Sequence, residues 1–205
     1  MNLPKLTLLL TLLSACTGGA EPEATATDPD RPWRLPGDAI DSILPMEVML
    51  TQFRTGMDSP ATLRSPAQGR EELARQFLAA VAAGDSTTLS ALLVNRAEFA
   101  WLLFPDHLYA LPPYELDPAI YWLQIQASSA KGAARVLERY GRRSLEFRGL
   151  DCVRDTVQFV TGPTVAWAPC TVTYRGNDST LTRRLFGTIV ERDGVAKFMG
   201  YATEF

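Results

Sequence analysis

The single histidine of the chain, His107, directly follows Asp106 in a proline-rich segment. Imidazole changes charge near neutral pH and a carboxylate can orient it, so this pair is the first candidate for general acid–base chemistry. Adjacent side chains rarely point at each other, however, and the sequence identifies no partner nucleophile. We therefore interpret His107 as a residue that packs within a loop, and we assign no catalytic residue.

Glu98 is a second residue with chemical potential, because it lies between Ala97 and Phe99 in an otherwise apolar segment. A carboxyl group in such surroundings can act as an acid or a base, but more often it forms a salt bridge with an arginine. The chain contains no phosphate-binding loop, nucleophile elbow, zinc-protease motif or dinucleotide fingerprint. One histidine cannot build a usual zinc site, and no acidic cluster has metal-ligand spacing. We expect neither a metal nor a cofactor.

Aromatic side chains that carry a polar atom are the candidate lining of a ligand pocket. They are common both in ligand sites and in small hydrophobic cores, so the sequence leaves both interpretations open. Together with the histidine, the candidates are Trp101, His107, Tyr109, Tyr121, Trp122, Trp167 and Tyr174. Such a pocket would suit a small hydrophobic ligand.

The N-terminus predicts export and a lipid anchor. Lys5 precedes an apolar run over residues 6–13, which is too short to span a bilayer, and Leu13-Ser14-Ala15-Cys16 follows at once. This arrangement resembles the signal peptide and lipobox of bacterial lipoproteins. The resemblance implies cleavage before Cys16 and attachment to a membrane through lipid on that cysteine. The alternative is an ordinary secretory signal that carries a cysteine by chance.

The same resemblance predicts a location in the cell envelope. Thr17 stands where an aspartate would indicate retention in the inner membrane, so we expect an outer-membrane anchor with the domain in the periplasm or at the cell surface. The formal net charge is −3 and no basic block stands out, which argues against a nucleic-acid partner. No stretch reaches the roughly 18–20 apolar residues of a membrane span, so a multi-span membrane protein is excluded.

Two cysteines remain after Cys16, namely Cys152 and Cys170. A lone pair of cysteines in an exported domain is a disulfide candidate, because the compartment is oxidising. Closing the loop between them would contribute about 3 kcal/mol in the chain-entropy model. A metal pair or reactive thiols lack support in the sequence.

The elements that must position these residues begin after a predicted disordered tether over residues 16–36, which is rich in Gly, Pro, Ala, Thr and acid. A short helix and loop extension is expected over residues 37–64, with the helix at 45–54. The main domain is expected over residues 65–205. Ser65 is expected to cap a helix that ends at Gly84, and Asp85 or Ser86 is expected to cap the helix that follows. A related helical segment covers 96–104. The next helix begins at Pro118 after Asp117 and ends at Gly141, with an apolar stripe of Ile120, Leu123, Ala127, Ala130, Ala134 and Leu137.

After Gly141 the hydrophobic period changes from helical to alternating, which predicts strands over residues 145–152, 156–160, 164–174, 179–190 and 195–205. Asp193-Gly194 suits the tight turn of a hairpin, and Pro169 suggests a bulge or an edge. Helices followed by an antiparallel meander predict an α+β fold, with the helices packed on one face of the sheet.

This order of helices and sheet resembles the NTF2-like, or cystatin-like cone, superfamily. Residues 77–85 (FLAAVAAGD) look like the exit of the first helix in many such domains. The resemblance implies a curved sheet and a pocket between its concave face and the helices. Our leading hypothesis is a non-catalytic envelope lipoprotein that binds a small ligand or an envelope protein partner. The alternatives are a small hydrolase or isomerase of the same fold, with Asp106, His107 or Glu98 as acid or base, and a structural accessory of an outer-membrane assembly.

Overall fold

The computed structural model describes residues 44–177 and 179–201. The predicted signal peptide, Cys16 and the predicted tether lie outside these residues. A compact unit runs over Leu44–Phe205, so the short helix that we assign to an extension belongs to the same unit as the main domain. Phe53 and Leu63 show why, because both side chains are buried in its core.

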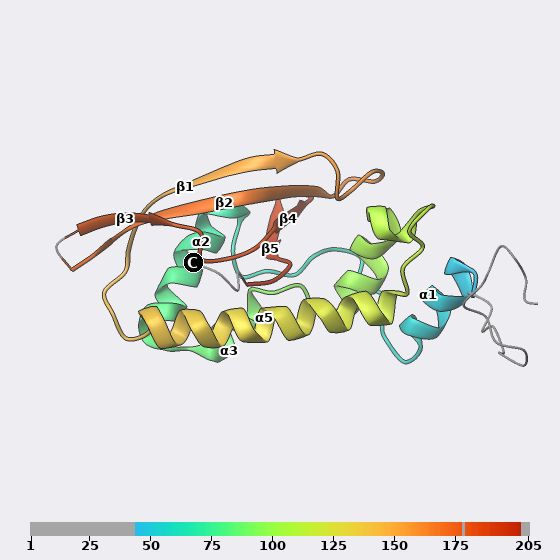
Figure 1. Ribbon diagram of the computed structural model, residues 1–205, viewed down its shortest axis with the longest axis horizontal. Coiled ribbons are helices and arrows are strands. Elements are labelled where there is room, and N and C mark those ends of the chain that lie inside the picture. The colour runs from blue at the N-terminus through green and yellow to red at the C-terminus, as the bar shows by residue number, and fades with distance from the viewer. Residues whose placement is uncertain (1–43, 178, 202–205) are drawn as a thin grey trace, which may run out of the picture. The chain divides into compact units, whose positions relative to one another are not determined.

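The helical segments precede the sheet in the chain (Figure 1). They are α1 (Met46–Arg54), α2 (Gly69–Ala83), α3 (Ser86–Ala91), α4 (Arg96–Glu98), the π-helix η1 (Phe99–Leu103), the 3₁₀ turns η2 (Phe104–Asp106) and η3 (Leu108–Ala110), and α5 (Pro118–Tyr140). The strands are β1 (Glu146–Asp155), β2 (Val165–Gly176), β3 (Ser179–Arg183), β4 (Ile189–Arg192) and β5 (Val195–Phe198). None of the described helices combines the length and the hydrophobicity that a membrane span requires.

The strands form an antiparallel sheet that is not closed into a barrel. β2 lies at its centre, paired with β1 along one edge and with β3 and β4 along the other, and β5 continues from β4. The helices lie on one side of this sheet in Figure 1, which confirms the predicted α+β class. Asp193 and Gly194 both have positive φ in the turn between β4 and β5, as the predicted hairpin requires.

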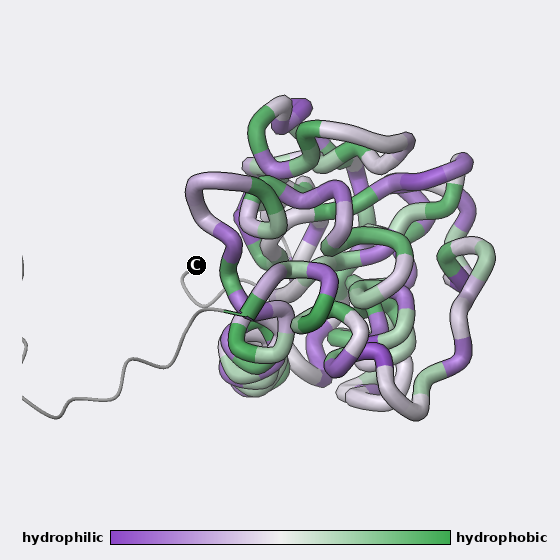
Figure 2. Tube along the Cα trace, turned by 90° about the vertical axis from the view of Figure 1, so that its right-hand side faces the viewer, coloured by the Kyte–Doolittle hydropathy of each residue, from purple (hydrophilic) through white to green (hydrophobic). Residues whose placement is uncertain are grey.

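Two hydrophobic clusters hold the elements together, and Figure 2 shows hydrophobic segments crossing the middle of the domain. In the first cluster, Phe77 of α2 packs edge-on against Phe186 and Phe198, with ring centroids 5.2 and 5.6 Å away. The second cluster surrounds the π-helix, where Phe99 contacts Phe53 and other rings. Each aromatic pair of this kind adds roughly 0.5–1.5 kcal/mol beyond the area that it buries.

The predicted disulfide is present between Cys152 of β1 and Cys170 of β2. The two residues are direct partners in the antiparallel register, with Cα atoms 4.1 Å apart. The register shifts next to this pair, where Ala168 and Pro169 of β2 lie opposite the single residue Val153 of β1, so β2 has one extra residue. The predicted irregularity at Pro169 is therefore confirmed, because proline cannot donate to a sheet ladder.

The start of α2 differs from the prediction. We expect Ser65 to cap this helix, but the helix begins at Gly69 after Gln68. Gln68 forms an isolated bridge with Val195, and Gly69 has a φ of 76°. The chain therefore first extends along β5 and then turns through a left-handed residue, and this long-range pairing overrides the local capping signal.

The predicted helix is present as α5, but most of its apolar stripe faces outward. Ile120 and Leu123 are 51% and 68% exposed, and Ala127, Ala130 and Ala134 are also exposed. The helix instead buries the face that contains Ser129, Gly132 and Val136. Small residues let a helix approach its neighbours closely, and Gly200 lies against Ser129 at this contact.

Two strand predictions also need correction. Residues 156–160 form no strand, although Phe159 makes an isolated bridge with His107. The predicted strand over 179–190 is two strands, β3 and β4, which pair with opposite ends of β2. The residues between them carry Leu185 and Phe186 into the core, so burial interrupts the regular pairing.

Candidate functional site

His107 is buried, with 2% of its surface exposed, between the 3₁₀ turns η2 and η3. Its ring stacks on Phe104 and meets the edge of Phe159, at centroid distances of 6.3 and 5.2 Å. Backbone hydrogen bonds hold this loop to the segment after β1, since Leu108 N donates to Gln158 O and Val160 N to Asp106 O. The packing interpretation of His107 agrees with this environment.

Both ring nitrogens of His107 have partners. Nδ1 accepts a hydrogen bond from the Tyr109 backbone N–H at 3.1 Å, and Nε2 lies 3.4 Å from the Tyr121 hydroxyl. Burial lowers the pKa of His107 from 6.5 to about 4, against the opposing attraction of the Asp155 carboxylate. The imidazole is therefore neutral at physiological pH.

Tyr121 connects this buried cluster to a pocket. Burial, together with neighbouring Tyr109, raises the pKa of Tyr121 to about 12, so its phenol stays protonated. The rings of Tyr109 and Tyr121 pack edge to face, with their centroids 5.0 Å apart. Tyr121 reaches the site from the first turn of α5, which Asp117 caps by accepting the Ala119 and Ile120 N–H groups.

The pocket has a volume of about 320 Å³ and lies between α5 and the segment that leads into and out of the β4–β5 hairpin. Its lining comprises Tyr121, Gln124, Ile125, Ser128, Ser129, Gln158, Gly187, Thr188, Met199, Gly200 and Tyr201. None of these residues carries a formal charge. This volume is at the lower end of the range for small-molecule sites.

No known protein family, curated protein sequence or solved structure matches this chain. Within the part of the chain that the structure describes, no group of three or more His, Cys, Asp or Glu side chains could hold a metal ion.

Of the seven residues that the sequence suggests for a pocket, the structure gathers His107, Tyr109 and Tyr121 into one cluster, and Tyr121 lines the pocket. Trp122 packs against Phe99 in the second hydrophobic cluster, with the ring centroids 5.1 Å apart. Trp101 lies under the Arg54 guanidinium, 4.1 Å from its ring centroid.

The other two aromatic candidates lie elsewhere. Trp167 of β2 lies under Arg70, and its Nε1 donates to a Glu191 carboxylate oxygen at 3.1 Å. Tyr174 is near Tyr140, at the end of the sheet where β3 pairs with β2. These two side chains therefore stabilise contacts between elements and do not line the pocket.

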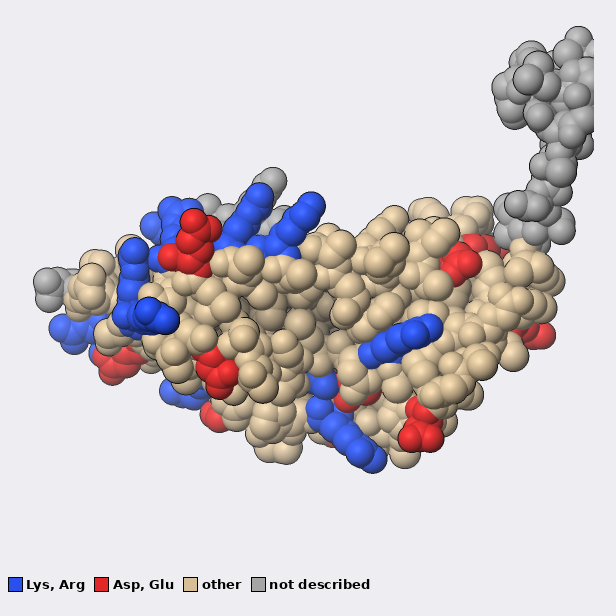
Figure 3. Space-filling model, turned by 90° about the horizontal axis from the view of Figure 1, so that it is seen from below, with Lys and Arg blue, Asp and Glu red and all other residues tan. Residues whose placement is uncertain are grey.

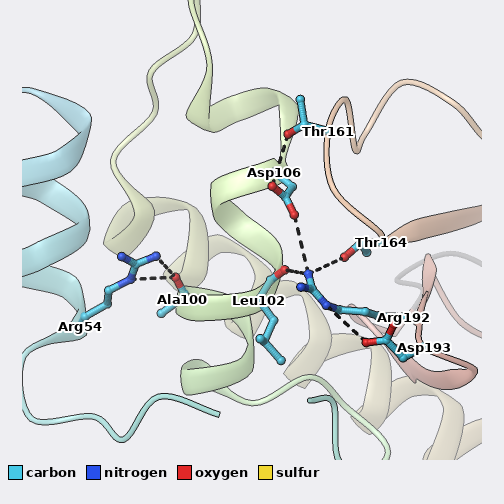
Figure 4. A network of polar contacts seen from close by, with 8 residues as sticks. All are labelled: Arg54, Ala100, Leu102, Asp106, Thr161, Thr164, Arg192 and Asp193. Atoms are coloured by element: carbon cyan, nitrogen blue, oxygen red, sulfur yellow. Dashed lines mark hydrogen bonds and ion pairs between the residues drawn. The ribbon is translucent and has the colours of Figure 1, made fainter. Parts of the chain in front are cut away.

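Asp106 does not pair with His107. Its carboxylate faces Arg192 at 3.7 Å and accepts a hydrogen bond from the Thr161 hydroxyl (Figure 4). Arg192 also donates to Leu102 O at 2.7 Å, and Arg54 donates to Ala100 O. Both carbonyls belong to the π-helix η1, so the contacts in Figure 4 fix an unusual helix. The imidazole of His107 has other partners, the Tyr109 N–H and the Tyr121 hydroxyl.

Glu98 is a structural residue for a similar reason. Its carboxylate accepts hydrogen bonds from the backbone N–H groups of Arg64 and Asn95, and from Lys197 Nζ at 2.7 Å. The expected salt bridge is present, although its partner is a lysine. All of these partners lie away from the pocket lining, so the geometry gives Glu98 no reacting group to serve.

Sequence reasoning missed most of the pocket. Gln124, Ser128 and Ser129 appeared only as polar interruptions in a helix, although their spacing places them near one another on α5. Gly187 and Gly200 were a second signal, because a Cβ at Gly187 would lie 3.0 Å from Gly200 O. Glycine at such a position indicates close backbone approach.

Proposed function

We propose that this protein is a lipid-anchored protein of the cell envelope whose domain binds a small, uncharged ligand without catalysis. The observation that carries the proposal is the pocket beside α5, in which the lining is uncharged and its residue Tyr121 contacts the buried His107. The presence of Ile125 and Met199 beside hydroxyl and amide groups favours a ligand with both apolar and polar parts.

Binding is favoured over acid–base catalysis by the state of the histidine. A general base works best when its pKa is near the operating pH, and the pKa of His107 is about 4. Both of its nitrogens already have partners within the protein. The imidazole therefore serves to hold Tyr121 in place.

The envelope location rests on the lipobox Leu13-Ser14-Ala15-Cys16 and on the disulfide, which suits an oxidising compartment. The proposal includes an NTF2-like cone. It is supported by helices on one side of an antiparallel sheet and by a pocket between a long helix and the sheet's C-terminal strands.

The lipid anchor is tested by growing cells with an alkyne analogue of palmitate. We expect label on the wild-type protein and none on a Cys16→Ser variant, because the thiol receives the lipid. A Cys152→Ser/Cys170→Ser variant is the matched control and should keep the label. Label that persists in Cys16→Ser would exclude this anchor.

The pocket is tested by native mass spectrometry of the protein extracted from its own membranes. Ser128 is an exposed residue that lines the pocket, whereas neighbouring Ala127 is exposed and does not. A tryptophan at position 128 should fill the pocket and remove a co-purifying small molecule, and Ala127→Trp should retain it. Retention in Ser128→Trp, or no bound molecule in the wild type, would contradict the proposal.

A second candidate, docking through the outer face of α5, is favoured by the exposed apolar stripe. Its residues recur at alternating spacings of three and four, the period with which one helix packs along another. In antiparallel pairing of two copies, Ile120 meets Leu137, Leu123 meets Ala134 and Ala127 meets Ala130. In Figure 3 several Lys and Arg gather towards the left end of the face and others lie low in the middle and right of the centre, with uncharged residues between them.

This second candidate predicts a dimer of the mature chain that Leu123→Asp dissociates, measured by sedimentation. Val153→Asp is the control, because Val153 is 56% exposed on β1 and outside the stripe. A monomer in the wild type at high concentration would rule out this use of the helix.

A further inference from the structure

The hydrogen bonds behind Tyr121 run in a defined direction. His107 Nδ1 accepts the Tyr109 N–H, so the single proton of the neutral ring is on Nε2. Nε2–H then donates to Tyr121 Oη, 3.4 Å away. The hydroxyl hydrogen of Tyr121 cannot point at a nitrogen that is itself protonated. Since Tyr121 lines the pocket, that hydrogen is available to a ligand.

Two further hydroxyl oxygens in the pocket lining also accept hydrogen bonds from the protein. Thr188 Oγ1 accepts a hydrogen bond from the Gln158 side-chain amide at 3.4 Å. Ser129 Oγ accepts one from the Tyr201 backbone N–H at 3.3 Å. Ser129 and Thr188 both line the pocket.

The three hydroxyls therefore share one property. The oxygens of Tyr121, Ser129 and Thr188 each accept a hydrogen bond from the protein, and no residue that the structure describes accepts their hydroxyl hydrogens. The wall presents donors from two different parts of the fold, α5 and the segment before β4. A hydroxyl donor in a partly enclosed site requires an acceptor, because an unsatisfied polar group costs roughly 1–3 kcal/mol when buried.

The charges around the site favour a neutral acceptor. The lining has no cation, so a carboxylate ligand would lose solvation without gaining a counter-charge. Asp155 lies behind the wall, where its carboxylate accepts the Gln158 side-chain amide at 2.7 Å. Its negative charge would repel an anionic ligand.

We propose that this pocket selects an uncharged ligand through carbonyl-type oxygens, which accept hydrogen bonds from the hydroxyls of Tyr121, Ser129 and Thr188. This inference rests on the proposed binding function and adds the chemical class of the ligand. His107 is a positioning residue in this arrangement, because it fixes the direction of the Tyr121 hydroxyl without reaching the pocket.

The direction of the hydrogen bonds is tested first, without any ligand. Nitrogen-15 NMR of residues 17–205, the chain after the lipidated Cys16, exported to an oxidising compartment, distinguishes the two neutral tautomers of His107. We expect the proton on Nε2. A proton on Nδ1 would reverse the chain of donors and overturn the inference.

The ligand class is tested with three small probes of similar size. These are N-methylpyrrolidone, which is neutral and only accepts hydrogen bonds; N-methylpyrrolidine, a cation without the carbonyl; and butyrate, an anion. We expect N-methylpyrrolidone to shift the backbone amide resonances of the pocket segments, and the other two probes to bind more weakly.

Tyr121→Phe and Thr188→Val should each weaken the binding of N-methylpyrrolidone roughly three- to tenfold, the effect of one hydrogen bond. Thr182→Val, which removes an exposed hydroxyl on β3 outside the pocket lining, should change it less than twofold.

The outcomes separate the two proposals. Binding of N-methylpyrrolidone that is unchanged in Tyr121→Phe and Thr188→Val, or equal binding of the charged probes, would overturn the carbonyl inference and leave the pocket function standing. Absence of any shift in the pocket amides with all three probes would count against the pocket function itself.

Discussion

Glu98 and Lys197 are 99 residues apart in the sequence, yet their side chains form an ion pair of 2.7 Å inside the domain. Both side chains are almost fully buried, at 1% and 4% exposure. The pair connects α4 to β5, and the carboxylate also accepts two backbone N–H groups. A charge in such a place is tolerated only with its partner present.

We therefore predict that Lys197→Met lowers the free energy of unfolding by about 3–5 kcal/mol, because it leaves an uncompensated carboxylate in the core. The double variant Glu98→Gln/Lys197→Met should recover most of this loss. Urea unfolding of the oxidised protein measures both values. Arg75→Met, which removes an exposed pair with Glu71, is the control and should cost under about 1 kcal/mol. A Lys197→Met variant as stable as that control would contradict the role of the buried pair.

His107 should make stability depend on pH in a defined window. Burial lowers its pKa from 6.5 to about 4, with Asp155 opposing the shift. Above pH 6.5 neither the folded nor the unfolded chain binds this proton. As the pH falls from 6.5 towards 4, the unfolded chain binds a proton that the folded chain excludes, so the free energy of unfolding decreases by up to about 3 kcal/mol.

The difference in stability between wild type and His107→Gln isolates this effect from the titration of carboxylates. We expect the difference to shrink between pH 6.5 and 4 and to stay constant above pH 7. NMR titration of the imidazole should give a midpoint near 4 in the folded protein. A midpoint near 6.5 would show that the ring is not buried as described.

Two glycines with nearly the same backbone conformation provide a matched pair of variants. Gly162 and Gly194 have φ values of 78° and 77°. A Cβ at Gly194 would meet nothing within 4 Å, whereas one at Gly162 would collide with the Asp106 carboxylate. We predict that Gly194→Ala costs about 1–2 kcal/mol through backbone strain alone. Gly162→Ala should cost more, because it also displaces Asp106 from Arg192. Equal costs in urea unfolding would mean that the Asp106 network contributes little.

Removing the disulfide should lower the free energy of unfolding by about 3 kcal/mol, because the loop of sequence separation 18 is then open in the unfolded chain. Cys152→Ala/Cys170→Ala compared with the oxidised wild type measures this effect. The reducing agent should destabilise the wild type by a similar amount and leave the double variant unchanged. Sensitivity of the double variant to the reductant would indicate another cause.

The sequence predicted the elements whose signals are local. Asp85 and Asp117 cap their helices, Gly84 ends α2 in a left-handed conformation, and Asp193-Gly194 makes the hairpin turn. Each of these depends on hydrogen bonds or backbone sterics within a few residues. The pairing of Cys152 with Cys170 was also predictable, since these are the two cysteines outside the lipobox.

Only the tertiary structure decided which face of α5 is buried. By itself the helix offers an apolar stripe through Leu123 and a small-residue face through Ser129, and hydrophobicity favours the first. Ser129 packs against Gly200 and its hydroxyl accepts the Tyr201 backbone N–H, and the small-residue face is the one that is buried. The pocket lies at the same contact, because α5 and the segment after β5 both line it. The Arg192 partner of Asp106 likewise comes from far away in the chain, and no local pattern could indicate it. His107 combines a local partner, the Tyr109 N–H, with Tyr121 of the next long helix.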